Sequence, residues 1–417
     1  MLDWNFADAD TQELTHGLCY YPARMVPQLA ARLLEMYWKK PSIILDPFTG
    51  SGTIILESLL RNHKVVGIDV NCIAIILARA KCTFLDEPVD IAKLQEHIKA
   101  TNDSVNIEID PIYLQAKKNI DYWYNRSIAT QLLALRQAIL QYLKTTGHPS
   151  QQWLLWVTLM STIYSCSRGI QDGSAFHTRK TSANPDAFQT FNRKLGENLE
   201  RVAQLRIAYL KRGYQPREGS LTQIFQESSH AHFNLTQGNA LTVLREIPRD
   251  SVSGILTSPP YGDEHSTVNY TRYTKHAAYW LGYSPVEVNK MSRQTLSSRK
   301  QVALPTNIPT TEKVLAQLKE VRGTDYLKVV HFLTEYYQFL KECHRILTTN
   351  AICAIVIANR RVRNVEIPMD HITTELASHI GMYPEAIFYR TFPRKVVAWK
   401  TISGKTMDQE NIIILRK

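Results

Sequence analysis

The chain of 417 residues is 44% hydrophobic and 21% charged, an ordinary globular composition. It is long enough for one large α/β domain with insertions, or for two domains. Lysine and arginine exceed aspartate and glutamate by 49 − 38 = 11, and this surplus favours a polyanionic partner, nucleic acid before any other.

Cysteine usage and hydropathy argue against a secreted, zinc-binding or membrane-spanning protein. The six cysteines form no C-x-x-C pair and have no nearby histidine at metal-ligand spacing, so we expect neither a metal site nor a disulfide framework. The longest apolar runs, such as AICAIVIA at 351–358, are too short to cross a bilayer, and the acidic MLDWNFADAD lacks the apolar segment of a signal peptide. We therefore expect a soluble, cytoplasmic protein with no membrane partner.

Strands and helices alternate in residues 1–86. An amphipathic helix follows Pro22 or Pro27 within residues 15–38. PSIILD and KVVGIDVN predict two short strands, separated by a glycine turn and a helix and followed by a second helix. Such a βαβ unit implies a parallel sheet. The predicted strands are residues 41–46 and 64–71. The glycine turn with its helix is 49–62, and the second helix is 73–85.

Residues 87–231 interrupt this alternation with a mainly helical pattern. Apolar residues recur at helical spacing in 127–143, 151–164 and 187–212. The part from Ser161 to Arg217 contains ten Lys or Arg against four Asp or Glu. The interpretation is a basic helical insertion that serves either as a DNA-recognition domain or as a helical buttress.

The α/β pattern resumes over 232–417, so a single α/β domain is split by the insertion. Strand signals return at 232–239 and 251–258, and the polar stretch 284–310 is typical of a mobile loop. The remaining predicted elements are a long helix at 325–347, a buried strand at 351–361, a helix at 369–380 and strands at 385–391, 395–400 and 411–416.

The motif DPFTGSGT, from Asp46 to Thr53, predicts a cofactor site. Its two glycines allow a sharp turn and a close backbone approach to a ligand. The third glycine of a dinucleotide fingerprint is replaced by Ile55, and no lysine follows as in a phosphate-binding P-loop. An acidic residue, Asp46, ends the strand instead and suits an ammonium group, while Asp69 at the end of the next strand is placed to accept from ribose hydroxyls. An amino-acid-bearing nucleoside without phosphates fits this pattern, namely S-adenosyl-L-methionine.

Together with TSPPYG at 257–262, this motif resembles the pair of signature motifs of the DNA amino-methyltransferases. These enzymes transfer a methyl group from S-adenosyl-L-methionine to an exocyclic base nitrogen. The serine form of the second motif resembles the cytosine-N4 branch, whereas Asp or Asn is commoner in the adenine-N6 branch. HGLCYYPARMVPQLAARLL at 16–34 is similar to the family's N-terminal cofactor motif, and QGNAL at 237–241 to its third motif, with Asn239 where Asp is commoner.

The resemblance implies a Rossmann-like class I methyltransferase fold, with a mostly parallel seven-stranded sheet and helices on both faces. It also implies double-stranded DNA as substrate, base flipping, and a restriction–modification system with a cognate restriction endonuclease. Residue by residue, it implies cofactor contacts from Pro22, Arg24, Asp46, Phe48, Gly50, Gly52, Thr53, Asp69 and Asn239, and a base pocket formed by Ser258, Pro259, Pro260 and Tyr261.

The chemistry of the SPPY corner follows from its residue types. An exocyclic amine conjugated to a ring is a poor nucleophile, and the Ser258 hydroxyl and the Pro259 carbonyl offer acceptors for its two hydrogens. The prolines fix that carbonyl, so little reorganisation is needed, and Tyr261 offers a face for stacking. Transfer is then an in-line displacement without a covalent intermediate. Carbon-5 methylation needs a cysteine nucleophile, and the Pro-Cys pair typical of that family is absent from the sequence.

Several alternatives stay open. Adenine-N6 methylation, RNA amino-methylation and a non-catalytic, methyltransferase-like DNA-binding subunit are each compatible with parts of the sequence. After the corner, Tyr270, Tyr273, His276 and Trp280 belong either to a DNA-contacting segment or to a packed helix. Three basic groups suit a channel for DNA phosphates when taken together: Arg360, Arg361 and Arg363; Arg390, Arg394 and Lys395; and Arg293, Arg299 and Lys300.

Overall fold

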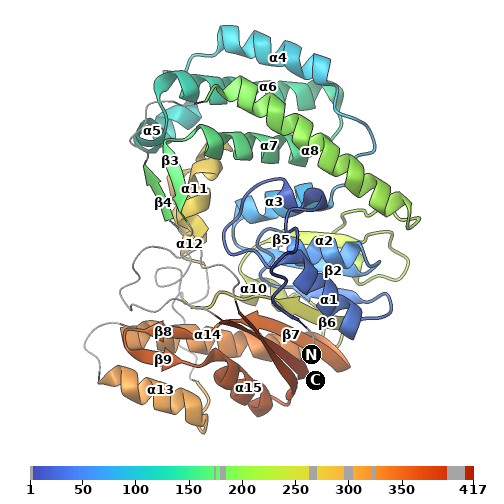
Figure 1. The fold of residues 1–417 in the computed structure, drawn as a ribbon, viewed down its shortest axis with the longest axis vertical. Helices are drawn as coiled ribbons and strands as arrows, with labels where there is room; N and C mark the ends of the chain where they lie inside the picture. Colours follow the sequence, from blue (N-terminus) through green and yellow to red (C-terminus); the bar gives the residue numbers. More distant parts are fainter. Residues whose placement is uncertain are drawn as a thin grey trace.

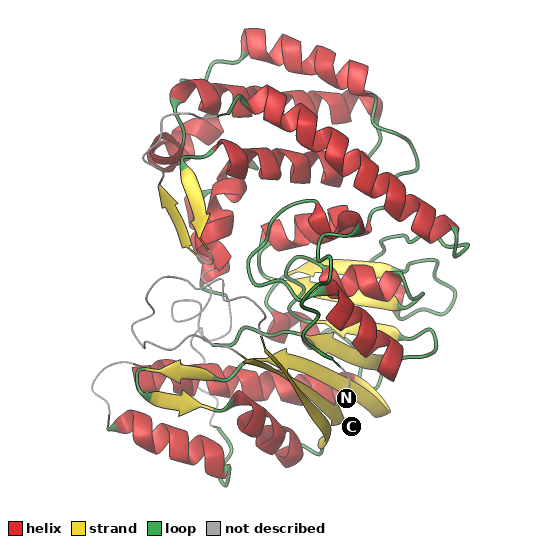
Figure 2. Ribbon diagram, in the orientation of Figure 1, coloured by secondary structure: helices red, strands yellow, loops and turns green. Residues whose placement is uncertain are grey.

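A seven-stranded sheet lies at the centre of the computed structural model, with strand order β10-β11-β7-β6-β1-β2-β5 (Figures 1 and 2). The structure describes residues 3–172, 175–178, 185–262, 270–294, 304–320, 325–391 and 409–417. The strands are β1 Ile43–Asp46, β2 Lys64–Asp69, β5 Phe233–Gln237, β6 Val252–Thr257, β7 Leu347–Ile357, β10 Tyr383–Thr391 and β11 Gln409–Arg416.

The sheet is parallel except for one strand. Strands β5, β2, β1, β6 and β7 pair in parallel, and β11 runs antiparallel to both β7 and β10. Strand β10 therefore points the same way as the five parallel strands. The predicted seven-stranded, mostly parallel sheet is confirmed.

Both faces of the sheet are buried, which explains the nearly continuous apolar sequences of its strands. On β1, Ile44 packs into the core on one face, with α1, α2 and part of α3, and Leu45 packs into the core on the other, with α10 and α13–α15. The flanking helices are α1 Pro27–Tyr37, α2 Thr53–Leu59, α3 Cys72–Cys82, α10 Ala240–Leu244, α13 Pro309–Lys319, α14 Asp325–Ile346 and α15 Met369–His379.

A helical layer lies beyond α3, at the top of Figure 1. Its residues share a hydrophobic core with the outer face of α3 and with two helices that follow β6, so the layer is anchored to the sheet domain. A hairpin of β3 and β4 interrupts the helices and was not predicted from the sequence. The elements are α4 Ile91–Ser104, α5 Pro111–Trp123, α6 Arg126–Thr146, α7 Gln151–Cys166, β3 Gly169–Asp172, β4 Ala175–Thr178, α8 Ala187–Leu210 and α9 Leu221–Ile224, with α11 Tyr270–Trp280 and α12 Pro285–Ser292 from the later segment.

Two sequence predictions differ from the structure. The stretch 284–310 is not a loop throughout, because Ser284 caps α12 with a capping box and Pro309 starts α13. The predicted strand at 351–361 begins earlier and ends at Ile357, and residues 360–362 instead form β8 Arg360–Val362, paired with β9 Val365–Ile367. The predicted strand at 395–400 lies outside the described residues.

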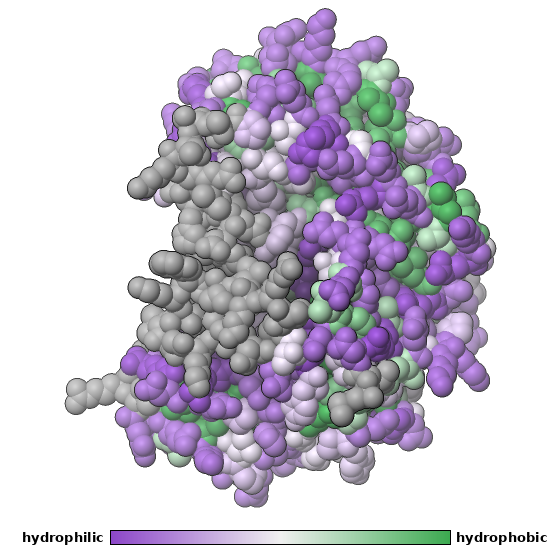
Figure 3. Space-filling view, viewed as in Figure 1, coloured by the Kyte–Doolittle hydropathy of each residue, from purple (hydrophilic) through white to green (hydrophobic). Residues whose placement is uncertain are grey.

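The face shown in Figure 3 is predominantly hydrophilic where it is coloured, with apolar residues in small scattered patches. Among the described residues, every helix is too short or too polar to cross a lipid bilayer.

Gly52 controls how closely α2 approaches α3. Its φ is +80°, and a Cβ built there lies 2.6 Å from Ala78 Cβ on α3. A side chain at this position therefore meets backbone strain and a steric clash together.

We predict that Gly52→Ala lowers the free energy of unfolding by about 2–4 kcal/mol, measured by urea denaturation. Gly147→Ala is the matched control, because Gly147 also has positive φ, +68°, but has nothing within 4 Å of its added Cβ. That variant loses about 1 kcal/mol, from strain alone. Equal losses in the two variants would contradict the role of the helix contact.

Candidate cofactor and base site

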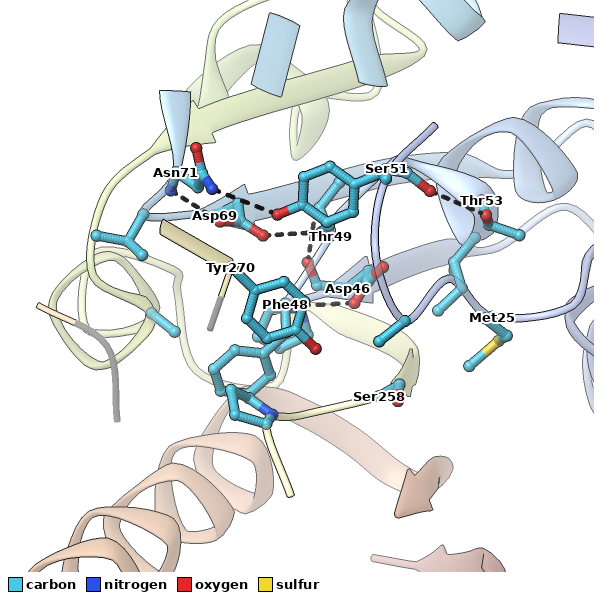
Figure 4. A pocket seen from close by; sticks show the side chains of 18 of the residues that line it. Met25, Asp46, Phe48, Thr49, Ser51, Thr53, Asp69, Asn71, Ser258 and Tyr270 are labelled. Atoms are coloured by element: carbon cyan, nitrogen blue, oxygen red, sulfur yellow. Dashed lines mark hydrogen bonds between the residues drawn. The ribbon is translucent and has the colours of Figure 1, made fainter. Parts of the chain in front are cut away.

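A single pocket gathers most of the sequence-predicted residues at the carboxyl ends of the central strands (Figure 4). The chain runs from β1 through β2 to β5 on one side and then crosses to β6 and β7 on the other, so strand order reverses between β1 and β6. Ligands of open α/β sheets bind at such a reversal. The lining residues are Tyr21, Ala23, Arg24, Met25, Asp46, Pro47, Phe48, Thr49, Gly50, Ser51, Thr53, Ile54, Asp69, Val70, Asn71, Gly238, Asn239, Ala240, Ser258, Pro260, Tyr270, Met291 and Gln294.

Asp46 is a buried carboxylate with one oxygen fully engaged and the other without a partner. Its Oδ1 accepts from the Thr257 hydroxyl at 2.7 Å and from the Phe48 backbone N–H at 3.2 Å. Its Oδ2 is buried and has no hydrogen-bond partner within the described part of the chain. Burial raises the pKa of Asp46 to about 7, against the two hydrogen bonds that lower it. A buried acceptor of this kind suits a cationic donor such as an ammonium group.

Asp69 lies at the end of the adjacent strand and ties the glycine loop to the start of α3. Its Oδ2 accepts from Gly50 N–H and its Oδ1 from Asn71 N–H, both at 2.8 Å. Burial raises the pKa of Asp69 to about 6, and the two backbone donors oppose that rise. Each carboxylate oxygen keeps a second lone pair, so Asp69 can still accept from two neighbouring hydroxyls of a ligand.

The glycine turn is sharp, as expected, and its two glycines have different roles. Gly50, at φ +51°, lines the pocket, and its N–H is the donor to Asp69. Gly52 does not line the pocket and instead permits the packing of α2 on α3. Thr53 lines the pocket next to Ser51, whose hydroxyl lies 3.4 Å from that of Thr53.

Nine of the thirteen predicted residues line the pocket. The four that do not are Pro22, Gly52, Pro259 and Tyr261. Arg24 lines it beside Tyr21 and donates to the backbone carbonyl of His16 at 2.8 Å. The side chain of Asn239 is engaged, since its Oδ1 caps α10 and its Nδ2 donates to the Gln294 carbonyl at 2.7 Å.

The SPPY corner directly follows β6, next to Asp46. Thr257 is the last residue of that strand and bonds to Asp46, and the next residue, Ser258, lines the same pocket. Pro259 is buried and Pro260 lines the pocket. Tyr261 is half-buried and packs with Phe48 against the core beside α14, and its hydroxyl lies 3.4 Å from Ser258 Oγ.

Tyr270 of α11, which the sequence left open between a DNA-contacting segment and a packed helix, lines the pocket and stacks with Tyr21, the ring centroids being 6.0 Å apart (Figure 4). Asn71 also lines the pocket and was missed from the sequence. Asn71 donates to the Thr274 hydroxyl at 3.0 Å, which fixes α11 against the end of β2. The Asn71–Thr274 contact joins residues 203 positions apart in sequence, and no local motif marks it.

Lys81 is the most unusual charged group near the site. It is fully buried in α3, and its Nζ donates to Ser51 Oγ at 3.1 Å. Burial, followed by the charge of Arg24, holds its pKa well below the usual value. Within the described residues Lys81 has no acidic partner at ion-pair distance, so it adds positive potential behind the glycine loop when it is protonated. It lies inside an apolar helical run, so spacing gave no signal.

Of the five predicted phosphate-binding residues that the structure describes, four are buried or paired with a carboxylate. Arg360 and Arg390 are buried, and Arg361 and Arg363 pair with Glu366 and Asp325. Tyr273, His276 and Trp280 of α11 are buried, and the ring centroids of His276 and Trp123 lie 4.7 Å apart. These three side chains therefore pack α11 into the protein interior. Arg293 is exposed, while Arg299, Lys300, Arg394 and Lys395 lie outside the described residues.

Comparisons with known proteins bear on the class of enzyme. A family described as DNA methylase matches residues 4–78, which include the N-terminal segment, the glycine loop, β1 and β2. Type II methyltransferase M.MvaI of Kocuria varians is 24% identical over 99% of this chain and 93% of its own length. Type II methyltransferase M.BsoBI of Geobacillus stearothermophilus is 22% identical over 98% of this chain and 85% of its own length. The comparisons support a DNA methyltransferase.

Among solved structures, the rRNA methyltransferase aviRa of Streptomyces viridochromogenes matches 95% of this chain and 86% of its own, at 12% identity. Its TM-score of 0.30 is too low for any conclusion. Methyltransferases in general use S-adenosylmethionine, and the pocket suits this cofactor because Asp46 offers an unpaired buried acceptor for its ammonium group. Among the described residues, no cluster of three His, Cys, Asp or Glu side chains suits a metal ion.

We predict that binding of S-adenosylhomocysteine weakens as the pH falls below about 7. A ligand ammonium needs ionised Asp46, and the raised pKa of about 7 means that protons compete for this carboxylate from that pH downward. Apparent affinity then falls by up to about tenfold per pH unit. Calorimetric titrations between pH 5.5 and 8.5 measure this slope.

Thr257→Val tests whether Asp46 is the titrating group. The variant removes the 2.7 Å hydrogen bond to the charged form of Asp46, so it shifts the midpoint of the affinity curve to higher pH. An affinity independent of pH in the parent protein, or an unmoved midpoint in the variant, would contradict the assignment.

Proposed function

We propose that this chain is a site-specific DNA methyltransferase that transfers a methyl group from S-adenosylmethionine to the N4 amine of a flipped cytosine in double-stranded DNA. The observation that carries the proposal is the shared pocket of Asp46 and Ser258, which joins an ammonium acceptor to an amine acceptor. The two signature motifs meet there because β1 and β6 are neighbours in the sheet.

On the cofactor side, Asp46 would receive the ammonium group and Asp69 the ribose hydroxyls. Arg24, which lines the pocket near the glycine loop, would face the methionine carboxylate. The cofactor supplies an electrophilic methyl group bonded to a cationic sulfur. Burial of both carboxylates strengthens their attraction for cationic and hydroxyl donors, since the local dielectric is lower than in water.

On the base side, Ser258 Oγ and the Pro259 carbonyl would accept the two amino hydrogens of the extruded cytosine. Accepting both hydrogens orients the nitrogen lone pair toward the methyl carbon. The nitrogen forms its new bond as the carbon–sulfur bond breaks, and it then loses one proton to water. Base stacking was expected from Tyr261, which does not line the pocket, so the aromatic side chains Tyr270 and Phe48 that do line it would contact the base instead.

Residues 1–86 and 232–417 would form the catalytic domain. The helical insertion 87–231 is proposed as the DNA-recognition domain. Its support is the basic composition of residues 161–217 and the shared core that joins its helices to α11 and α12, which follow the SPPY corner. A restriction endonuclease with the same recognition site would be the partner in a restriction–modification system.

Incubation of DNA with trideuteromethyl-labelled S-adenosylmethionine, followed by digestion and nucleoside mass spectrometry, tests the proposed reaction. The expected product is labelled N4-methylcytosine. Label only in N6-methyladenine would instead establish the adenine branch, label in RNA nucleosides would establish an RNA enzyme, and cofactor binding without any transfer would indicate a non-catalytic subunit.

We predict that Ser258→Ala lowers kcat roughly a hundredfold while the cofactor Kd changes less than about twofold, because the hydroxyl contacts the base and not the cofactor. Single-turnover transfer and calorimetry measure the two quantities. Ser251→Ala is the matched control, because Ser251 directly precedes the other end of β6 and its hydroxyl donates to the Pro248 carbonyl at the surface. Equal losses of kcat and cofactor affinity in Ser258→Ala would contradict the assigned role.

A further inference from the structure

A chain of polar side chains leads from Ser258 away from the pocket to the antiparallel strand of the sheet. Ser258 Oγ lies 3.4 Å from the hydroxyl of Tyr261, and that hydroxyl donates to Glu410 Oε1 at 2.6 Å. The other carboxylate oxygen of Glu410 lies 3.5 Å from Nε of Arg390. The four residues come from the SPPY corner, β11 and β10.

The fold holds these four side chains in fixed positions. Glu410 and Arg390 are register partners on β11 and β10. The Arg390 side chain is 4% exposed and that of Glu410 13% exposed. Because β11 runs opposite to the parallel strands, its first residues lie at the same edge of the sheet as the carboxyl end of β6. Glu410 at the start of β11 thus comes within hydrogen-bond distance of Tyr261, in the corner that follows β6.

The donors and acceptors that the Ser258, Tyr261 and Glu410 side chains carry determine the direction of the hydrogen bonds between them. A carboxylate only accepts, so the Tyr261 hydroxyl must give its proton to Glu410. Burial and the neighbouring Glu410 charge raise the pKa of Tyr261 well above its usual value, which keeps that proton on the phenol. Tyr261 then presents only lone pairs toward Ser258, so Ser258 is the donor in the 3.4 Å contact.

This direction matters because an exocyclic amine is itself a donor. A serine hydroxyl has one proton and two lone pairs, and it assists an amine only when its proton points elsewhere. Donation toward Tyr261 leaves the lone pairs of Ser258 for the amine. A pre-oriented acceptor needs no rotation when the base arrives.

We propose that Glu410 is a positioning residue for methyl transfer, which acts through Tyr261 to hold Ser258 as an acceptor toward the target amine. The inference rests on the proposed amine methylation, but it does not depend on whether the amine belongs to cytosine or adenine. The direction of the hydrogen bonds, from Ser258 through Tyr261 to Glu410, is then part of the site.

Glu410→Gln is the direct test. The substituted amide has nearly the same shape but can donate to Tyr261, which allows the tyrosine proton to turn toward Ser258. We expect kcat for the base that the parent protein methylates to fall about tenfold to a hundredfold, with cofactor Kd within about twofold of the parent. Tyr261→Phe keeps the ring and removes the hydroxyl, and it should show the same split.

Double variants separate this role from a structural one. In a Ser258→Ala background, Glu410→Gln should cost no further activity, because the acceptor that it orients is gone. A merely structural contribution would add its loss in both backgrounds. Glu385→Gln is the matched control, because Glu385 lies on β10 and pairs with Arg416. Removing the charge of Glu385 should leave kcat unchanged.

The outcomes are distinct. Parent protein without transfer to any base nitrogen would overturn the proposed function itself. An active parent with an equally active Glu410→Gln variant, or with additive losses in the double variant, would overturn the positioning role alone. Urea denaturation of each single variant shows that the protein is folded under assay conditions, and Tyr261→Phe provides an independent reading if Glu410→Gln does not fold.

Discussion

The buried carboxylate of Asp46 is the interaction on which the rest of this site depends. It links the two central strands, because its Oδ1 accepts from Thr257 at the end of β6 while its own residue ends β1. It also holds the turn after β1 by accepting from Phe48 N–H. Both bonds fix the orientation of the side chain and leave Oδ2 buried and unpaired among the described residues. Burial of an incompletely paired carboxylate costs stability, and such a cost is typical of a residue retained for a ligand.

The site is assembled from distant segments because each contributes the end of a strand at the same sheet edge. Asp46 and Asp69 end parallel neighbours, Ser258 follows the strand on the other side of β1, and Glu410 begins an antiparallel strand. The antiparallel direction of β11 is therefore functional in this account, since a parallel strand would bring its last residues to that edge instead. Helix α11 closes the arrangement by contact between Asn71 and Thr274.

Much of this could be predicted from sequence because the governing signals are local. Apolar strands that end in Asp46 and Asp69, the glycine turn between them and the rigid proline corner are short motifs with their own physical reasons. The β3–β4 hairpin and the short helix α12 were missed, since four-residue strands and a capped two-turn helix give weak periodicity. The dual use of the glycines was not visible either, because Gly52 faces Ala78 only once α2 and α3 are packed.

Contacts between distant segments account for the remaining misses. Arg390 was expected among phosphate-binding groups, but β10 and β11 pair it with Glu410 inside the fold. Tyr261 follows the expected proline corner, yet its hydroxyl is directed by a carboxylate 149 residues away. Lys81 lies in an apolar helix and becomes unusual only because Ser51 and Arg24 surround it. Sequence alone supplies residue types at strand ends, while sheet order decides which of them meet.

The claim that Asp46 receives the ammonium group of the cofactor can be tested most directly by calorimetry with two ligands. S-adenosylhomocysteine carries the amino-acid part and 5′-methylthioadenosine lacks it. In Asp46→Asn, at pH 8, we expect affinity for S-adenosylhomocysteine to fall roughly tenfold to a hundredfold, the worth of a charge-assisted hydrogen bond, with affinity for 5′-methylthioadenosine unchanged. Equal loss of both ligands, or no loss of either, would contradict the account.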